Sequence, residues 1–128
     1  MPKACVPHDG YRFEAGRRFV RKKSLNKLKD SIRAKTGRAR GVSLERAIAD
    51  LNPLLRGWFG YFKQAHPTTF ADIDGFVRRR LRSMLLKQKK RSHIGFGTLI
   101  HKTWPIAFFA AAGLFALQPA WQSARRSR

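Results

Sequence analysis

The chain is poor in acidic residues and contains almost no cysteine. Its 128 residues include 7 Asp and Glu against 28 Lys and Arg, which gives a formal net charge of +21, and one cysteine, Cys5. A single cysteine can form neither an intramolecular disulfide nor a zinc site that needs paired cysteines. A disulfide-stabilised secreted domain and a zinc finger are therefore excluded, and the excess of positive charge indicates a polyanionic partner.

Long hydrophobic runs are also missing. Residues 1–9 contain two prolines, Lys3 and Asp9 where a signal peptide would need an apolar core, so we expect an irregular leader there. The continuous apolar run from Ile106 to Leu117 is too short to cross about 30 Å of hydrocarbon as a helix. We therefore expect a cytoplasmic protein without a membrane partner.

The few carboxylates are dispersed along the chain, which argues against enzymatic chemistry. Metal-assisted phosphoryl transfer needs clustered carboxylates to hold the ions. Asp72 and Asp74 form a close pair, but two positions apart on a helix their side chains point to different sides. We predict no catalytic activity, no metal and no cofactor.

Apolar residues are abundant enough for one small core. They make up 43% of the chain and include ten Phe and three Trp. The stretch from Tyr11 to Val20 predicts a short β-hairpin that turns at Gly16. Ser24 is placed to cap a helix over about 25–36, and the glycine-rich loop 37–41 that follows presents Arg38 and Arg40 on flexible backbone.

Two further helical segments carry apolar stripes. Ser43 is expected to start the first, and the Asn52-Pro53 step is expected to break it, with Asn52 capping a new helix that begins at Pro53. Thr69 is expected to cap the second, over about 70–90. The two stripes consist of Leu44, Ile48, Leu51, Leu55, Trp58 and Phe62, and of Phe70, Ile73, Val77, Leu81 and Met84.

The helix predicted over 70–90 is unusually basic. A solvated helix face normally mixes acidic with basic residues, whereas like charges at helical spacing repel one another by a few tenths of a kcal/mol per pair. An external anion would relieve that repulsion, and the alternative is a solvated basic face with no partner. The basic residues of this arc are Arg78, Arg79, Arg80, Arg82, Lys87, Lys89 and Lys90.

Some of these residues have two interpretations. Arg80 lies beside Ile73 on the helical wheel, so it could pack internally as readily as bind RNA. Arg56 adjoins the Leu55 and Trp58 face, and we favour a structural role for it. Among the neighbouring aromatic residues, Trp58 and Phe62 fit packing, while Tyr61 is the candidate for stacking on an unpaired base.

Several segments, taken in order, resemble one known family. The central one is Leu51-Asn-Pro-Leu-Leu-Arg-Gly-Trp-Phe-Gly-Tyr-Phe62, which is similar to the signature of the maturase-specific domain of group II intron-encoded reverse transcriptases, also called domain X or the thumb. Flanking motifs agree: Gly10-Tyr-Arg-Phe13, Ser43-Leu-Glu45, the stretch Phe70 to Arg82, and Trp104-Pro-Ile-Ala-Phe-Phe with Gly113-Leu-Phe-Ala-Leu117. The signature positions are Asn52, Pro53, Arg56, Gly57, Trp58 and Phe62.

The resemblance implies a fold and a division of the chain. It implies a mainly α protein, a small bundle of about four helices preceded by the hairpin. Residues 10–23 would be a remnant of the polymerase palm edge, 24–118 the maturase-specific domain and 119–128 a basic flexible tail. The polymerase fingers and palm have no counterpart, so the chain looks like a C-terminal piece of a larger protein. Phe13, Phe19, Trp104 and Phe109 could then be left exposed, although Trp104 and Phe109 could instead close the core.

The resemblance also implies a function. Such domains bind the structured intron RNA that encodes them and promote its splicing, here by a chain without polymerase activity. The residues predicted to contact RNA are Arg38, Arg40, Arg78, Arg79, Arg82, Lys87, Lys89 and Lys90. Two alternatives stay open: a thumb subunit of a split reverse transcriptase, partnered by a separate palm chain or a second copy, and a cationic protein at membrane surfaces.

Overall fold

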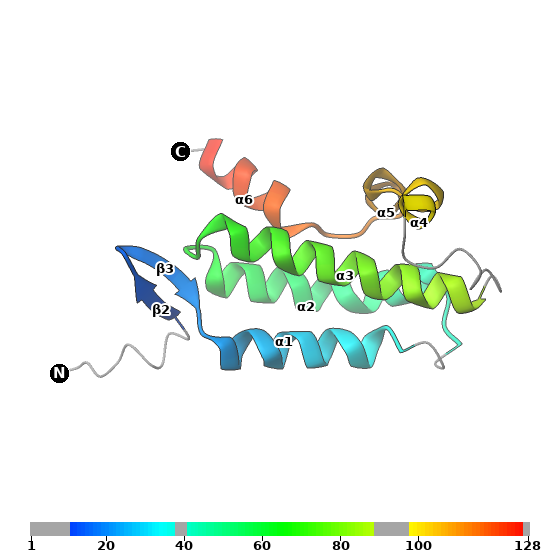
Figure 1. Ribbon diagram of the computed structural model, residues 1–128, viewed down its shortest axis with the longest axis horizontal. Helices are drawn as coiled ribbons and strands as arrows, with labels where there is room; N and C mark the ends of the chain where they lie inside the picture. Colours follow the sequence, from blue (N-terminus) through cyan, green and yellow to red (C-terminus); the bar gives the residue numbers. More distant parts are fainter. Residues whose placement is uncertain (1–10, 38–40, 89–97, 127–128) are drawn as a thin grey trace.

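The computed structural model describes residues 11–37, 41–88 and 98–126, which form a helical bundle with a hairpin at one end (Figure 1). The predicted mainly α fold class is confirmed. The elements are β2 (Tyr11–Glu14), β3 (Arg17–Val20), α1 (Lys22–Lys35), α2 (Leu44–Phe62), α3 (Pro67–Gln88), α4 (Thr98–Thr103), α5 (Ile106–Ala111) and α6 (Leu117–Arg126).

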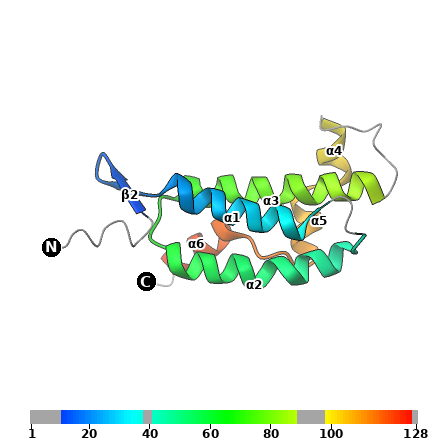
Figure 2. The same cartoon turned by 90° about the horizontal axis from the view of Figure 1, so that it is seen from below.

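The long helices α1, α2 and α3 run along the long axis of the molecule (Figure 2). α1 packs against both α2 and α3, and α6 lies across α3 and α2. Every residue of the predicted α3 stripe, from Phe70 to Met84, is at most 1% exposed. The α2 stripe is buried as well, except that Trp58 is half-buried. Each buried large apolar side chain contributes about 1.5–3 kcal/mol, so these two stripes hold the bundle together.

The predicted hairpin is confirmed, with Tyr11 opposite Val20 and Glu14 opposite Arg17. Ala15 and Gly16 form its two-residue turn with φ of 51° and 76°, the backbone conformation that matches the right-handed twist of paired strands. The backbone N–H of His66 donates to the carbonyl oxygen of Arg18 at 2.8 Å. This bond attaches the hairpin to the turn between α2 and α3.

The predicted break at Asn52-Pro53 is wrong, because α2 continues through both residues. A proline inside a helix costs roughly 3 kcal/mol relative to alanine. Leu51 and Leu55 flank it on the buried stripe, each fully buried, and together they outweigh that cost. Asn52 therefore caps no helix. Its side-chain amide donates to the carbonyl oxygen of Gly113 at 2.9 Å, and its Oδ1 accepts from the backbone N–H of Phe115 at 2.8 Å.

Two predicted helix starts are also wrong. α1 begins at Lys22, before Ser24, because it follows directly on the hairpin, where Arg21 Nε donates to the carbonyl oxygen of Tyr11. α3 begins at Pro67, a favoured first helical residue, so Thr69 lies inside the helix and is buried. The third predicted cap is confirmed, since Ser43 Oγ accepts from the backbone N–H of Arg46 at 3.1 Å.

The C-terminal segment differs most from expectation. Residues 119–126, predicted as part of a flexible tail, belong to α6, whose first residue Leu117 is fully buried. The carboxylate of Asp74 on α3 accepts from the backbone N–H groups of Leu117 and Gln118 at 2.8 and 2.9 Å, which satisfies two donors at the start of α6. No helix within the described segments combines the length and apolar composition needed to cross a bilayer.

We expect Asp74→Ala to lower the free energy of unfolding by about 1–3 kcal/mol, because it leaves two backbone N–H groups of α6 without acceptors. Urea denaturation measures the change. Asp72→Ala is the matched control, since Asp72 lies on the same helix and is exposed. Equal stability of the two variants would show that Asp74 does not hold α6.

Burial raises the pKa of Asp74 above its ordinary value of 3.8, against the opposing effects of the two backbone N–H donors and Arg78. The stability that the Asp74 carboxyl contributes is thus fully present when the pH is below its pKa in the unfolded chain. This stability is lost as the pH rises through its pKa in the folded chain. We expect Asp74→Asn, which carries no charge, to gain stability relative to the unmodified chain as the pH rises from below 3.8 towards neutrality. Urea denaturation across that range tests it, and a difference independent of pH would contradict it.

Candidate RNA interface

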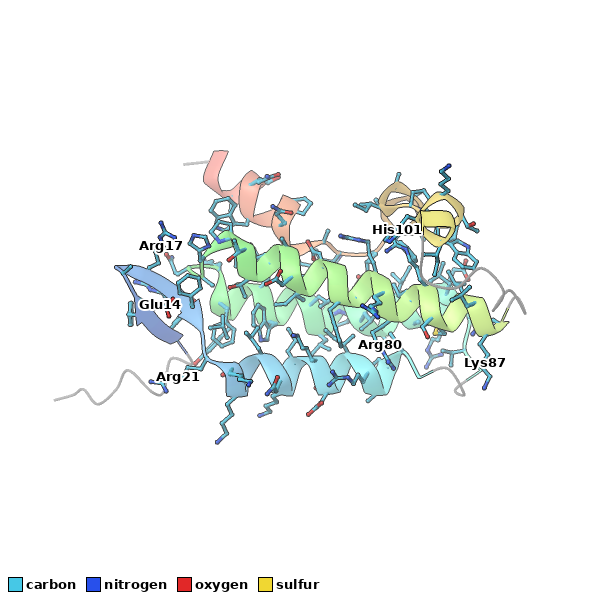
Figure 3. The ribbon with its side chains drawn as sticks, in the orientation of Figure 1. Glu14, Arg17, Arg21, Arg80, Lys87 and His101 are labelled. Carbon is cyan, nitrogen blue, oxygen red and sulfur yellow. The ribbon has the colours of Figure 1, made fainter. Side chains whose placement is uncertain are left out.

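The arginines of α3 do not form one surface. Seen along the helix, Arg79 is exposed on the side opposite the buried stripe, while Arg78 is half-buried and follows Asp74 by one helical turn. Arg80 points to the end of α1, where its Nε donates to Oγ1 of Thr36, the residue that follows the helix, at 3.2 Å (Figure 3). Internal packing, one of the two interpretations of Arg80, is therefore what the structure shows.

Arg82 is the most buried of the predicted RNA contacts that the structure describes. Its side chain is only 5% exposed, its Nε donates to the carbonyl oxygen of Trp104 at 2.9 Å, and its guanidinium lies 5.4 Å from the ring centre of Phe109. Burial lowers the pKa of Arg82, and Arg78 nearby lowers it further. These contacts fit a structural role, in which Arg82 anchors the segment between α4 and α5, and its predicted contact with RNA stays a prediction.

The apolar residues suspected of exposure divide into two groups. Phe13 is 57% exposed, as expected, and Phe19 is half-buried, stacked on His66 at a ring distance of 5.1 Å. Trp104 and Phe109 are buried, so of their two interpretations the structure confirms the role in the core.

The signature residues of α2 mostly serve packing. The ring of Trp58 lies 4.6 Å from that of Phe62, and Phe62 is buried. Arg56 is exposed, with its guanidinium 5.5 Å from the ring centre of Phe115, which it partly covers. Pro53 is exposed. Gly57 is exposed too, and an added Cβ would meet nothing within 4 Å, so nothing in the structure explains this glycine.

Tyr61 lies on the surface of α2. It is 61% exposed and meets the edge of the Phe62 ring at 4.6 Å. An exposed aromatic ring next to a rigid buried one suits base stacking, so the predicted role stays a prediction.

The structure brings together a basic surface that spans two helices. On α1, Lys29 Nζ and the Arg33 guanidinium lie 5.5 and 5.1 Å from the ring centre of Phe76 on α3. Arg79 follows Phe76 by three residues and Lys87 by eleven, so both lie on the same side of α3. We call Lys29, Arg33, Phe76, Arg79 and Lys87 the α1–α3 basic face. Figure 3 shows Lys87 near the end of α3, on the side of α1.

The carboxylates near the α1–α3 basic face compete only weakly with phosphate for its cations. Asp30 pairs with Arg33 at 2.8 Å, but both side chains are at least half exposed, and such surface pairs contribute little. Asp72 is exposed on α3. Phosphate groups can therefore replace these contacts. Sequence reasoning missed the α1 members because charges on separate helices show no common periodicity, although the basic run from Arg17 to Arg40 signalled a second cluster.

The other predicted contacts cannot be placed. Arg38, Arg40, Lys89 and Lys90 lie outside the described residues, as does the predicted leader. In sequence, Arg38 and Arg40 follow α1, and Lys89 and Lys90 follow α3. In the part of the chain that the structure describes, no group of three or more His, Cys, Asp or Glu residues could hold a metal ion.

A comparison with protein families finds one match. Residues 25–104, more than half of the chain, match the family described as "Group II intron, maturase-specific domain". The chain belongs to this family. Membership of the maturase-specific family implies a role in the splicing of group II introns, and the match includes most of α1 and the whole of α2, α3 and α4. A comparison with curated proteins finds no match.

Substitution of the buried Arg82 should change the free energy of unfolding more than substitution of the exposed Arg79. We expect Arg82→Gln to lower the free energy of unfolding by about 1.5–3 kcal/mol, because it removes a charged donor from the Trp104 carbonyl oxygen. Arg79→Gln should change it by less than about 0.5 kcal/mol, as exposed substitutions usually do. Thermal or urea denaturation of both variants tests this, and a harmless Arg82→Gln would contradict the structural role of Arg82.

Proposed function

We propose that this domain binds folded group II intron RNA through the α1–α3 basic face and assists splicing by stabilising the folded RNA, without catalysis of its own. The observation that carries the proposal is the contact of Lys29 and Arg33 on α1 with the ring of Phe76, on the side of α3 that also carries Arg79 and Lys87. Family membership supports the RNA partner, since it implies work on group II introns.

The chemistry of the α1–α3 basic face suits an RNA backbone. Guanidinium groups donate two parallel hydrogen bonds to a phosphate, and lysine adds a mobile point charge. Folded RNA offers phosphates on neighbouring strands, which two helices held side by side can engage together. Recognition of this kind reads shape more than sequence, as is usual for double-helical RNA.

Binding should depend steeply on salt. Each neutralised phosphate lowers log K by roughly 0.7–0.9 per unit of log salt concentration. We expect the triple variant Arg33→Gln, Arg79→Gln, Lys87→Gln to bind a group II intron RNA more weakly and to reduce this slope by about 2–3. Filter binding across a salt series measures both quantities.

The control variant is Lys23→Gln, Lys27→Gln, Lys102→Gln, which removes the same charge from exposed positions off the α1–α3 basic face. An unrelated folded RNA of equal length serves as the second ligand. If the two triple variants lost equal affinity for the intron RNA, net charge alone would drive binding, and the proposal would be wrong.

A second candidate function is the thumb subunit of a split reverse transcriptase. It is favoured by exposed apolar residues on α5 and the hairpin, where Ile106 is 60%, Phe108 37% and Phe13 57% exposed. A separate palm chain could cover them. Copurification with such a chain, lost on Ile106→Ser with Phe108→Ser, would support this candidate.

A further inference from the structure

A pocket lies where the hairpin, the turn between α2 and α3, and α6 meet. Its volume is about 330 Å³, at the lower end of the range of about 300–1,000 Å³ typical of sites for small ligands. The lining residues that matter here are Arg17, Arg18, Lys63, His66, Pro67 and Trp121. The pocket lies apart from the α1–α3 basic face, with which it shares no residue.

The fold holds the walls of this pocket in place by contacts already described. The His66 N–H donates to the Arg18 carbonyl oxygen, and the Phe19 and His66 rings stack, so the hairpin cannot turn away from the α2–α3 turn. Asp74 fixes the start of α6, which carries Trp121 over the pocket. Figure 3 shows Arg17 extending from β3 on the side of α6.

The pocket is electropositive. Arg17 and Lys63 contribute two cations, and no carboxylate is among the lining residues. Arg18 lines the pocket as well, but its guanidinium lies 5.4 and 5.6 Å from the ring centres of Tyr11 and Phe13, on the face of the hairpin opposite to Arg17. Pro67 is the first residue of α3, so the positive end of that helix dipole adjoins the same space. These features together favour an anion.

Trp121 adds a flat aromatic surface to the site. It is half-buried against the core, which holds the ring in place while part of it lines the pocket. Indole is a good surface for stacking a nucleobase, and such stacking tolerates every base. A phosphate site beside an aromatic platform matches the two halves of a nucleotide, and single strands expose bases in this way.

We propose that this pocket binds one nucleotide of a single-stranded RNA segment, with its phosphate at Arg17 and Lys63 and its base stacked on Trp121. The proposal rests on the proposed function, because it adds a second contact to the same RNA. The α1–α3 basic face then holds folded RNA, and the pocket captures an adjoining unpaired strand.

The test uses the full chain and two fluorescein-labelled probes, a short single-stranded oligoadenylate and its abasic counterpart, which carries the same phosphates without bases. We expect the unmodified chain to bind the oligoadenylate more tightly than the abasic probe. Trp121→Ala should remove this preference, with a loss of roughly fivefold to a hundredfold in affinity for the oligoadenylate alone. Trp121→Phe, which keeps an aromatic ring and the packing of α6, should retain most of it.

The phosphate part of the site is tested separately by salt dependence. Arg17→Gln should reduce the slope of log K against log salt by about 0.7 for the oligoadenylate, and Lys63→Gln should do the same. Lys102→Gln on α4, at the opposite end of the molecule (Figure 1), is the charge-matched control and should leave the slope unchanged. Circular dichroism confirms that each variant is folded.

Three results would overturn the proposal. They are equal binding of the two probes by the unmodified chain, a base preference that survives in folded Trp121→Ala, and displacement of the oligoadenylate by polyglutamate as readily as by unlabelled oligoadenylate. We expect Trp121→Ala to lose the preference for the oligoadenylate over the abasic probe. The same variant should still bind intron RNA through the α1–α3 basic face. Loss of intron binding in the Arg33, Arg79, Lys87 variant tests the proposed function independently.

Discussion

The C-terminal segment covers apolar surface of α2 and α3 with three short helices, and the polar backbone groups of the irregular stretches between these helices need partners. Three side chains from α2 and α3 supply them in succession. Arg82 donates to Trp104, Asn52 binds Gly113 and Phe115 through both ends of its amide, and Asp74 accepts from the first two N–H groups of α6. The position of α6, and with it the pocket beside the hairpin, depends on these bonds.

These contacts also explain why charged residues on a basic helix have different functions. Asp74, Arg78 and Arg82 follow one another at intervals of four residues, so they form one row along α3 beside the buried stripe. The C-terminal segment lies over this row. Arg79, on the side away from the core, stays exposed and joins the cations of α1. The polar residues of one helix are thus shared between holding the fold and meeting RNA.

The two proposed RNA sites use different chemistry. The α1–α3 basic face is a rigid surface on two helices packed side by side, suited to phosphates of a folded RNA. The pocket combines cations from the hairpin and the α2–α3 turn with an indole from α6, which suits an unpaired nucleotide. Since the hairpin is bonded to the α2–α3 turn at His66, both sites belong to one body and would act on one RNA.

The sequence by itself determined the family, the mainly helical class, the hairpin and the two apolar stripes, because periodicity and short motifs are local properties. It failed at Pro53, where the packing of Leu51 and Leu55 outweighs a local preference, and it could not show the contacts of Arg82 and Asp74, whose partners lie 22 and 43 residues further along the chain. The grouping of Lys29 and Arg33 with Arg79, and of Arg17 with Trp121, was decided by tertiary structure alone. No periodicity relates charges on separate helices, so only their packing could reveal which cations share a surface.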